Sequence, residues 1–293
     1  MTIDISVIVP FLNEERYVRR CVESLLASDY PRERCELIFV DNGSTDGGAR
    51  IVGEYAEVTL LTETRGKVYT ARNTAIGAAV GEVLAFTDAD CTVGPRWLAA
   101  IHDAILVRGA TFAMGPVRFA SRRSELLDVI ETYRNDHIQY VIEHQLWNHL
   151  YGYTNNLAVR ADVFARLGLF AELPVPGDTE LVHRCLRQLA DTRIVYCPDM
   201  GIDHLELVSG RTLFRKLVDY GEFEVNLPQV RYAPPCARRR SGAEAYSARL
   251  HRYSLRRRLL FRLGVFACNA CFVFGKWRGR LRRALGKRRS PRP

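Results

Sequence analysis

The first 90 residues alternate between short apolar runs and segments in which apolar residues recur at helical spacing. The apolar runs are rich in Val, Ile, Leu and Phe, which favour buried strands, and lie at residues 5–10, 36–40, 58–61 and 83–87. The segments between them predict three helices. The first is capped by Asn13, has Glu14 and Glu15 in its first turn and carries its apolar positions over residues 18–26, and the others cover residues 48–56 and 69–80. This alternation predicts a mostly parallel sheet covered by helices on both faces.

Beyond Pro95 the pattern becomes mixed. The predicted helices are residues 97–107, 124–150, 162–167 and 178–188, and the predicted strands are 111–119, 155–159 and, as the last one, 193–197. A stretch of Ala, Pro, Arg, Ser and Gly at 233–247 predicts a linker. The chain thus divides into residues 1–100 and 101–232, the two halves of one domain, and a tail of residues 233–293.

Charge is distributed very unevenly along the chain. Of 293 residues, 47% are apolar and 26% are charged, which is ordinary for a globular protein and excludes a disordered or collagen-like chain. The net charge is +9, but residues 236–293 hold 18 Lys and Arg against one acid, Glu244. The preceding 235 residues hold 24 basic and 32 acidic side chains. An anionic partner is therefore expected for the tail only.

The tail contains a 17-residue apolar run, residues 259–275, with basic clusters on both sides. As a helix this run would be about 25 Å long, which is shorter than the ~30 Å hydrocarbon core of a bilayer. We expect a helical tail that lies on an anionic membrane surface through residues 250–293. A packed pair of soluble helices and a membrane-spanning helix are the alternatives, and no nucleic-acid partner is expected.

The eight cysteines follow no disulfide or zinc-site spacing, and Cys268 and Cys271 lie in the apolar run, where packing explains them. Thiols in such a pattern are typical of a reducing compartment. The N-terminus shows no charged-then-apolar leader. We therefore expect a cytoplasmic protein, held peripherally at the inner face of the cytoplasmic membrane.

Candidate chemistry gathers at the carboxyl ends of the predicted strands. Asp88 and Asp90 follow the fourth strand, and Asp41 follows the second. Ligands of open α/β sheets bind at this edge. Two carboxylates one residue apart repel each other unless a cation joins them, and Mg²⁺ or Mn²⁺ accepts carboxylate and phosphate oxygens together. Basic residues on the same edge, Arg72 among them, suit a nucleoside diphosphate. The alternative for Asp88 and Asp90 is a solvated acidic turn.

Four segments resemble the motifs of family 2 glycosyltransferases, in the same order and at similar spacing: residues 6–14, 38–46, 71–73 and 86–90. The resemblance covers about residues 3–205. It implies a GT-A fold, in which a Rossmann-like half with a mixed, mostly parallel sheet binds the nucleotide sugar. It also implies an inverting transferase that moves a sugar from a nucleoside-diphosphate sugar, with a UDP-sugar favoured, to the hydroxyl of a glycan, lipid-linked or small-molecule acceptor. Residues 1–100 would bind the donor and residues 101–232 the acceptor.

The resemblance also implies roles for residues that match the family's donor-binding motifs. Asp41 would bind the base, with Pro10 and Glu14 beside it. Arg72 would lie near the base or the diphosphate, and Asp88 near the ribose.

For the metal and the chemistry, the resemblance implies that Asp90 and His204 hold Mn²⁺ or Mg²⁺ and that Asp178 is the catalytic base. A structural histidine is the alternative for His204. The family's acidic pair commonly has Glu before this Asp, where this chain has Gly177. A helix N-cap is the alternative for Asp178, and Glu180 is the second candidate for the base.

Two further features bear on the acceptor. The Gln-x-x-Arg-Trp motif of the family's processive members is not found in this sequence, which predicts addition of single sugars. The aromatic residues between 133 and 153 either line an acceptor pocket or pack on the core.

Two rival functions are also compatible with the sequence. One is an inactive scaffold that binds nucleotide sugars. The other is a haloacid-dehalogenase-type phosphatase, because residues 88–92 match its Asp-x-Asp-x-Thr motif. That motif belongs on the first strand of its fold, whereas three strands are predicted before it here. A nicotinamide dehydrogenase is excluded, because no Gly-x-Gly-x-x-Gly follows the first strand.

Overall fold

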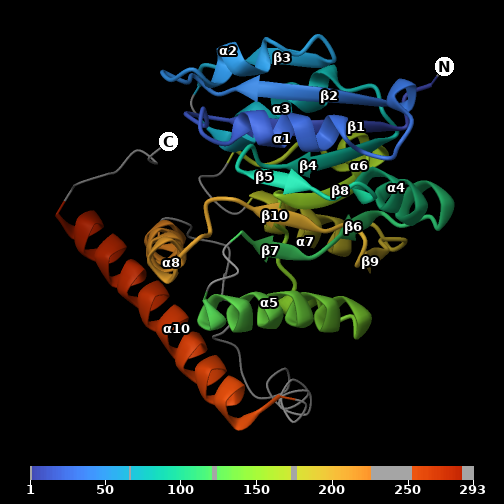
Figure 1. The fold of residues 1–293 in the computed structure, drawn as a ribbon. Helices are drawn as coiled ribbons and strands as arrows, with labels where there is room; N and C mark the ends of the chain where they lie inside the picture. Colours follow the sequence, from blue (N-terminus) through green and yellow to red (C-terminus); the bar gives the residue numbers. More distant parts are fainter. Residues whose placement is uncertain (1, 66, 121–123, 173–176, 226–252, 286–293) are drawn as a thin grey trace. The chain divides into compact units, whose positions relative to one another are not determined.

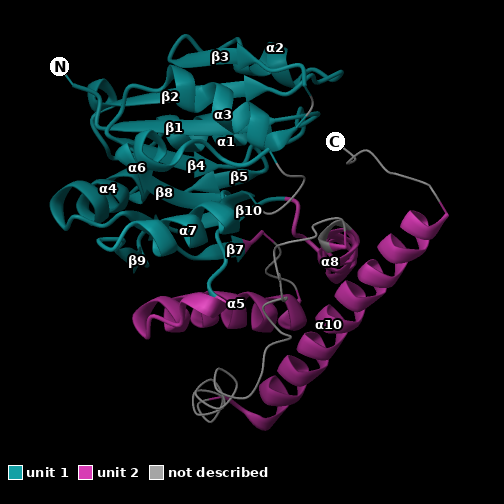
Figure 2. Cartoon of the chain, turned by 180° about the vertical axis from the view of Figure 1, so that it is seen from behind, with its two compact units in different colours: residues 1–118, 150–205, 293 teal, residues 119–149, 206–292 magenta. Residues whose placement is uncertain are grey.

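The structure is a computed structural model, and it describes residues 2–65, 67–120, 124–172, 177–225 and 253–285. The chain forms two compact units (Figure 2). Unit 1 contains residues 1–118 and 150–205, and unit 2 contains residues 119–149 and 206–292. The linker predicted at 233–247 lies outside the described residues.

Unit 1 is built on a seven-stranded sheet in the order β3-β2-β1-β4-β8-β6-β9 (Figure 1). The first four of these strands are parallel, and β8 is antiparallel to both of its neighbours. The strands are β1 (Ile5–Phe11), β2 (Cys35–Asp41), β3 (Val58–Thr62), β4 (Val83–Thr87), β6 (Phe112–Met114), β8 (Asn156–Arg160) and β9 (Ile194–Tyr196). The prediction of an α/β fold with a mostly parallel sheet is confirmed.

Helices cover both faces of this sheet, because both faces of its strands are apolar. On one face, Val7 and Phe39 pack in a cluster with Trp97. On the other face, the ring of Phe86 contacts the ring of Phe164 at 6.2 Å between centroids. The helices of unit 1 are α1 (Val18–Leu26), α2 (Gly48–Val52), α3 (Val68–Ala78), α4 (Trp97–His102), which a π-helical turn Asp103–Val107 continues, α6 (Asp162–Leu167) and α7 (Gly177–Gln188).

Asn13 does not cap the first helix, and this prediction is wrong. Helix α1 begins at Val18 after Tyr17, and no side chain caps it. Asn13 has a positive φ of 57°, and its side-chain oxygen accepts a hydrogen bond from the Thr45 amide at 2.8 Å. Asn tolerates this left-handed conformation better than most residues, so it is used here to join two loops.

The strand predicted over residues 111–119 is in fact two strands, β6 and β7 (Val117–Phe119), which belong to different sheets. The chain turns at Gly115, where a Cβ would lie 2.1 Å from the Met200 carbonyl oxygen. Pro116 cannot donate to a ladder, and so favours the break. β7 joins a three-stranded sheet, in the order β5-β10-β7, with β5 (Cys91–Val93) and β10 (Ile202–His204). The strand at 193–197 is therefore not the last one.

The described part of unit 2 is helical, and its helices share a small apolar core. They are α5 (Glu125–Glu143), a 3₁₀ turn (Trp147–His149), α8 (Gly210–Glu224) and α10 (Leu255–Ala284). Leu127, Leu213 and Cys268, from the three long helices, pack in one buried cluster. The apolar run at 259–275 thus lies within a longer helix of 30 residues.

Helices α8 and α10 touch through their backbones. A Cβ on Gly221 of α8 would lie 2.1 Å from the carbonyl oxygen of Phe272, and one on Gly275 of α10 would lie 2.0 Å from that of Val218. Only glycine leaves room for such an approach. This contact fixes which face of α10 is turned inward in unit 2.

Ion pairs also tie α10 to its neighbours in unit 2. Glu222 of α8 is 5% exposed and accepts hydrogen bonds from Arg278 and Arg282, each at 2.6 Å. At the other end of α10, Arg256 pairs with Glu125 of α5 at 2.6 Å. Several basic residues of the tail are therefore matched by acids within the protein.

Gly275→Ala is expected to lower the free energy of unfolding by about 1–3 kcal/mol, as other overpacking substitutions do. The reason is the 2.0 Å distance from the new Cβ to the Val218 oxygen. Urea denaturation followed by circular dichroism measures the change. Gly77→Ala in α3 is the matched control, because nothing lies within 4 Å of its Cβ position. The control should gain about 0.5–1 kcal/mol, and an equal effect of the two substitutions would contradict the backbone contact.

Candidate functional site

The turn after β4 carries two carboxylates that face different partners. Asp88 is about one-third exposed, and its Oδ1 lies 2.7 Å from a guanidinium nitrogen of Arg72. Asp90 is buried, and its Oδ2 lies 3.4 Å from Nδ1 of His204. The solvated-turn alternative therefore does not describe Asp90.

Arg72 is a buried cation on α3, with 3% of its surface exposed. Its guanidinium lies 5.3 Å from the centre of the Tyr69 ring, one helical turn earlier, in addition to its ion pair with Asp88. A buried guanidinium is strongly destabilising unless a carboxylate compensates its charge. The pair with Asp88 therefore fixes both side chains at the end of β4.

Strand pairing brings His204 to Asp90. β10 runs antiparallel to β5, and His204 is the register partner of Cys91. The amide of Leu205 also donates a hydrogen bond to the Asp90 carbonyl oxygen at 2.7 Å. The sequence places these residues more than 100 positions apart, and the sheet sets them side by side.

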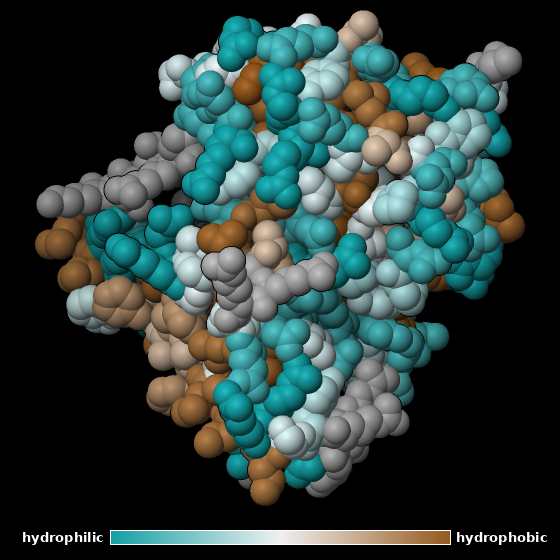
Figure 3. All heavy atoms as spheres, in the orientation of Figure 1, coloured by the Kyte–Doolittle hydropathy of each residue, from teal (hydrophilic) through white to brown (hydrophobic). Residues whose placement is uncertain are grey.

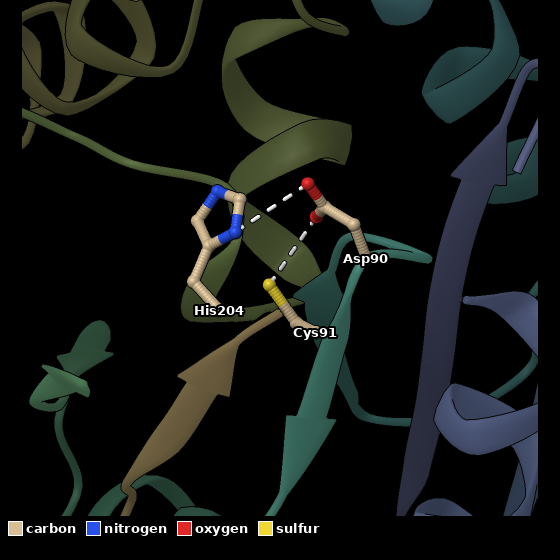
Figure 4. Close-up of side chains that lie close together, drawn as sticks. All are labelled: Asp90, Cys91 and His204. Atoms are coloured by element: carbon tan, nitrogen blue, oxygen red, sulfur yellow. Dashed lines mark hydrogen bonds and ion pairs between the residues drawn. The ribbon is translucent and has the colours of Figure 1, made fainter. Parts of the chain in front are cut away.

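Asp90, Cys91 and His204 form a cluster of oxygen, sulfur and nitrogen atoms (Figure 4). One ligand atom from each residue lies within 4.8 Å of the other two, and all three residues are buried. Burial and then the negative charge of Asp90 raise the pKa of the Cys91 thiol. This donor set and its spacing fit a divalent cation, and the role of Asp90 and His204 as its ligands stays a prediction.

Asp178 lies in the first turn of α7, where backbone amides hold its carboxylate. Its Oδ1 accepts a hydrogen bond from the Thr179 amide at 2.7 Å, and its Oδ2 accepts one from the Thr154 amide at 3.1 Å. The helix begins at Gly177, and the carboxylate bonds the next residue and a separate segment. The N-cap alternative is therefore wrong for Asp178.

The electrostatics of Asp178 suit a base. Burial raises the pKa of its carboxyl above the ordinary value, although the Thr179 amide, the charge of Arg72 and the Thr154 amide all lower it. The Tyr69 hydroxyl also contacts Asp178, because it accepts a hydrogen bond from the Asp178 backbone amide at 3.3 Å. A carboxylate with a raised pKa accepts a proton more readily than an ordinary one. Glu180, the second candidate, is 3.4 Å from Arg184 in an ion pair.

The ends of β1 and β2 form the third part of the site. Phe11 and Asp41 are register partners, and Pro10 is buried in the same strand. Asp41 is also buried, and its Oδ1 accepts a hydrogen bond from the Ser44 amide at 2.8 Å. In the loop after β1, the Glu14 carbonyl oxygen accepts the hydrogen bond of the Val18 amide, which opens α1.

Three residues near the predicted site were not assigned a role from the sequence. In the sequence Cys91 is one of eight cysteines that follow no site spacing, and the pairing of β5 with β10 sets it opposite His204. Tyr69 could have been found, because it precedes Arg72 by one helical turn. Thr154 lies in a segment that resembles the family, but its contact with Asp178 uses the backbone amide, which leaves no mark in a sequence.

A comparison with protein-family models matches residues 6–167 to "Glycosyl transferase family 2". Among curated relatives, glycosyltransferase AglE of Haloferax volcanii is 34% identical over 121 residues, which are 39% of this chain and 40% of AglE. The poly(ribitol-phosphate) beta-N-acetylglucosaminyltransferase TarS of Staphylococcus aureus is 37% identical over 90 residues, 29% of this chain and 16% of TarS. The matches therefore span less than half the length of these relatives.

Solved structures share the fold at low sequence identity. The mannosyltransferase PcManGT of Pyrobaculum calidifontis, in complex with GDP-Man and Mn²⁺, has a TM-score of 0.61 at 21% identity, over 94% of this chain and 88% of that chain. Residues 1–349 of S. aureus TarS, in complex with UDP-GlcNAc, have a TM-score of 0.52 at 16% identity, over 97% of this chain and 93% of that chain. The predicted GT-A fold is confirmed, and with it the phosphatase fold is excluded.

Proposed function

This chain belongs to glycosyl transferase family 2, and we propose that it moves a sugar from a nucleoside-diphosphate sugar to an acceptor hydroxyl with inversion at the anomeric carbon. That it is a glycosyltransferase follows from the family. The position of Arg72, which pairs with Asp88 and whose charge acts on the Asp178 carboxyl, carries the rest of the proposal. It supports the proposal that the turn after β4 and the start of α7 belong to one electrostatic site.

The donor would bind at the ends of β1, β2 and β4. Asp41 would recognise the base, with Pro10 and Glu14 beside it. The Oδ1 atom of Asn42, next to Asp41, is buried and has no hydrogen-bond partner among the described residues, which suits a donor group on the base. Asp88 would bind the ribose. A UDP-sugar is the favoured donor, and TarS and PcManGT are proteins solved with UDP-GlcNAc and with GDP-Man.

Asp90 and His204 would hold Mn²⁺ or Mg²⁺, whose positive charge would offset the negative charge that develops on the leaving diphosphate. Their convergence at 3.4 Å in a buried setting supports this role. PcManGT was solved with Mn²⁺. Arg72 is a second source of positive charge near the diphosphate.

Asp178 would act as the base. As the acceptor oxygen bonds to the anomeric carbon, the bond from that carbon to the diphosphate oxygen breaks, and the hydroxyl proton moves to Asp178. The two events occur on opposite faces of the sugar, so the configuration inverts without a protein nucleophile. The raised pKa of Asp178 supports this assignment. The acceptor would be a glycan, a lipid-linked glycan or a small molecule, extended by one sugar at a time.

The tail helix supports a membrane partner. α10 is the one described helix that is long and apolar enough to cross a membrane, and 28% of its most apolar 18-residue segment is buried. One face of α10 packs on α8 through the glycine contacts given above, and on α5, where a Cβ on Gly264 would lie 3.1 Å from side-chain carbons of Ile130 and Leu126. The other face exposes an apolar stripe in which 45–80% of each residue is accessible: Leu255, Leu259, Leu263, Phe266, Val273, Phe274, Trp277, Leu281 and Leu285. Figure 3 shows apolar residues gathered at the lower left of the molecule, where Figure 1 draws α10.

Exposed arginines flank this stripe. Arg262, Arg280 and Arg283 are exposed, whereas Arg278 and Arg282 pair with acids of α8. An apolar stripe with arginines beside it is typical of a helix that lies in the interface of an anionic membrane. We propose that the protein acts in the cytoplasm, at the inner face of the cytoplasmic membrane, with α10 lying on the surface.

Asp178→Asn is expected to keep binding of the nucleoside diphosphate and to lose transfer by about 10²–10⁴-fold, the usual worth of a general base. Asp90→Ala is expected to lose the Mn²⁺-dependent part of that binding. Calorimetry with UDP and GDP, with and without Mn²⁺, measures binding. Turnover is measured as hydrolysis of a nucleotide sugar that carries whichever of the two nucleotides binds, with water as the acceptor.

The two variants are controls for each other, because each removes one buried carboxylate. Full turnover in Asp178→Asn would contradict its role as the base. Equal binding by Asp90→Ala and wild type in Mn²⁺ would contradict its role in holding the metal. Failure of wild type to bind either nucleotide would contradict the proposed donor.

The double variant Phe266→Asn and Trp277→Asn is expected to reduce binding to phosphatidylglycerol vesicles at least tenfold. Each substitution removes an exposed aromatic side chain whose burial is worth about 1.5–3 kcal/mol. Cosedimentation with vesicles measures it. The matched control is Val80→Asn with Val107→Asn, two exposed apolar residues of unit 1. Equal sedimentation of wild type and the α10 variant, or none by wild type, would contradict the membrane surface.

A further inference from the structure

The mechanism proposed above gives Cys91 no role, although Cys91 lies next to Asp90 and His204, the two proposed metal ligands. Its side chain is fully buried, directly after Asp90 in the chain and opposite His204 in the pairing of β5 with β10. Its Sγ lies 3.5 Å from Oδ1 of Asp90. Packing alone would be served equally well by an apolar residue, and such a residue would offer nothing to a cation.

Two distances in this cluster match those between ligands of one small cation. Around Zn²⁺, bond lengths of about 2.0–2.2 Å to nitrogen and oxygen and about 2.3 Å to sulfur place neighbouring tetrahedral ligands about 3.3–3.7 Å apart. Oδ2 of Asp90 lies 3.4 Å from Nδ1 of His204, and Oδ1 of Asp90 lies 3.5 Å from Sγ of Cys91. The three ligand atoms lie within 4.8 Å of one another. Small side-chain rotations therefore suffice to form the site.

We propose that Cys91 is the third protein ligand of a site that selects Zn²⁺ or another borderline divalent cation over Mn²⁺ and Mg²⁺. A sulfur, nitrogen and oxygen donor set suits Zn²⁺ and Co²⁺, whereas Mg²⁺ and Mn²⁺ prefer oxygen. Three protein ligands leave a fourth tetrahedral position open, as in catalytic zinc sites. The proposal shares Asp90 and His204 with the proposed function, but it does not depend on glycosyl transfer.

The proposal implies that Zn²⁺ and Mn²⁺ compete for the same site. A cation that engages only Asp90 and His204 leaves Cys91 as a thiol that donates its hydrogen to Asp90. A cation that also engages Cys91 gains a thiolate bond. By the usual order of affinities, Zn²⁺ binds such a site more tightly than Mn²⁺ does. Zn²⁺ is therefore expected to displace Mn²⁺ from this cluster.

Co²⁺ is the probe for the test, because a thiolate bound to it gives a charge-transfer absorption band that nitrogen and oxygen ligands do not give. Metal-free full-length protein is titrated with Co²⁺ under reducing conditions, and the spectrum is recorded. We expect wild type to show the sulfur band at one Co²⁺ per chain, and we expect an equivalent of Zn²⁺, but not of Mg²⁺, to abolish it. We expect Cys91→Ser and Cys91→Ala to lack the band.

The affinity for Zn²⁺ gives a second readout. Outer-shell partners are already worth about 10–100-fold in metal affinity, so loss of a ligand in Cys91→Ala should weaken Zn²⁺ binding by at least that factor. Cys197→Ser, at another buried cysteine of unit 1, is the matched control and should keep the band.

A wild-type spectrum without a sulfur band overturns the proposal, whatever the variants do. A band that persists in Cys91→Ser or Cys91→Ala also overturns it, because another cysteine then holds the metal. Wild-type protein that binds UDP or GDP with Mn²⁺ but shows no sulfur band contradicts the role of Cys91 alone. Protein that shows the band but binds no nucleotide contradicts the proposed function alone.

Discussion

A guanidinium taken out of water needs a carboxylate beside it, and unit 1 meets this need for Arg72 at its functional edge. Arg72 is 3% exposed and lies 2.7 Å from Asp88, while its charge also lowers the pKa of Asp178. Burial acts on Asp178 in the opposite direction and is the larger effect. The balance leaves a buried carboxylate that is readier to take a proton than an ordinary Asp, beside a cation that suits a phosphate group. The first property comes from the burial of Asp178, which outweighs the charge of Arg72, and the second comes from Arg72 itself.

The first half of the fold could be predicted from the sequence because its signals are local. The strand runs ending near Pro10, Asp41 and Asp88 are continuous and apolar, and all three proved to be parallel neighbours in one sheet. The second half was harder. Its strands β6, β7 and β10 have three residues each, which is too few to show an alternating pattern. Gly115 is needed at the turn because the Met200 backbone lies against it, and the sequence does not show that contact.

The same distinction holds for the site and the tail. Asp90 and Asp178 stand in motifs that a sequence displays, whereas the amides that hold Asp178 and the strand register that sets Cys91 opposite His204 come from the tertiary structure. In the tail, the net charge gave no hint that Glu222 of α8 would neutralise arginines of α10. The apolar run also marked only the middle of α10, because its arginine-rich ends are helical without being apolar.

The most direct test of the account is the titration of Asp178 itself. Carbon-13 NMR of protein labelled at its Asp carboxyl carbons gives the pKa of each group, and the Asp178→Asn variant assigns the resonance of interest. The account predicts that Arg72→Met, which removes the charge and keeps much of the side-chain bulk, moves the midpoint for Asp178 to higher pH. An unchanged midpoint would show that Arg72 and Asp178 do not share one electrostatic site, and would contradict the account.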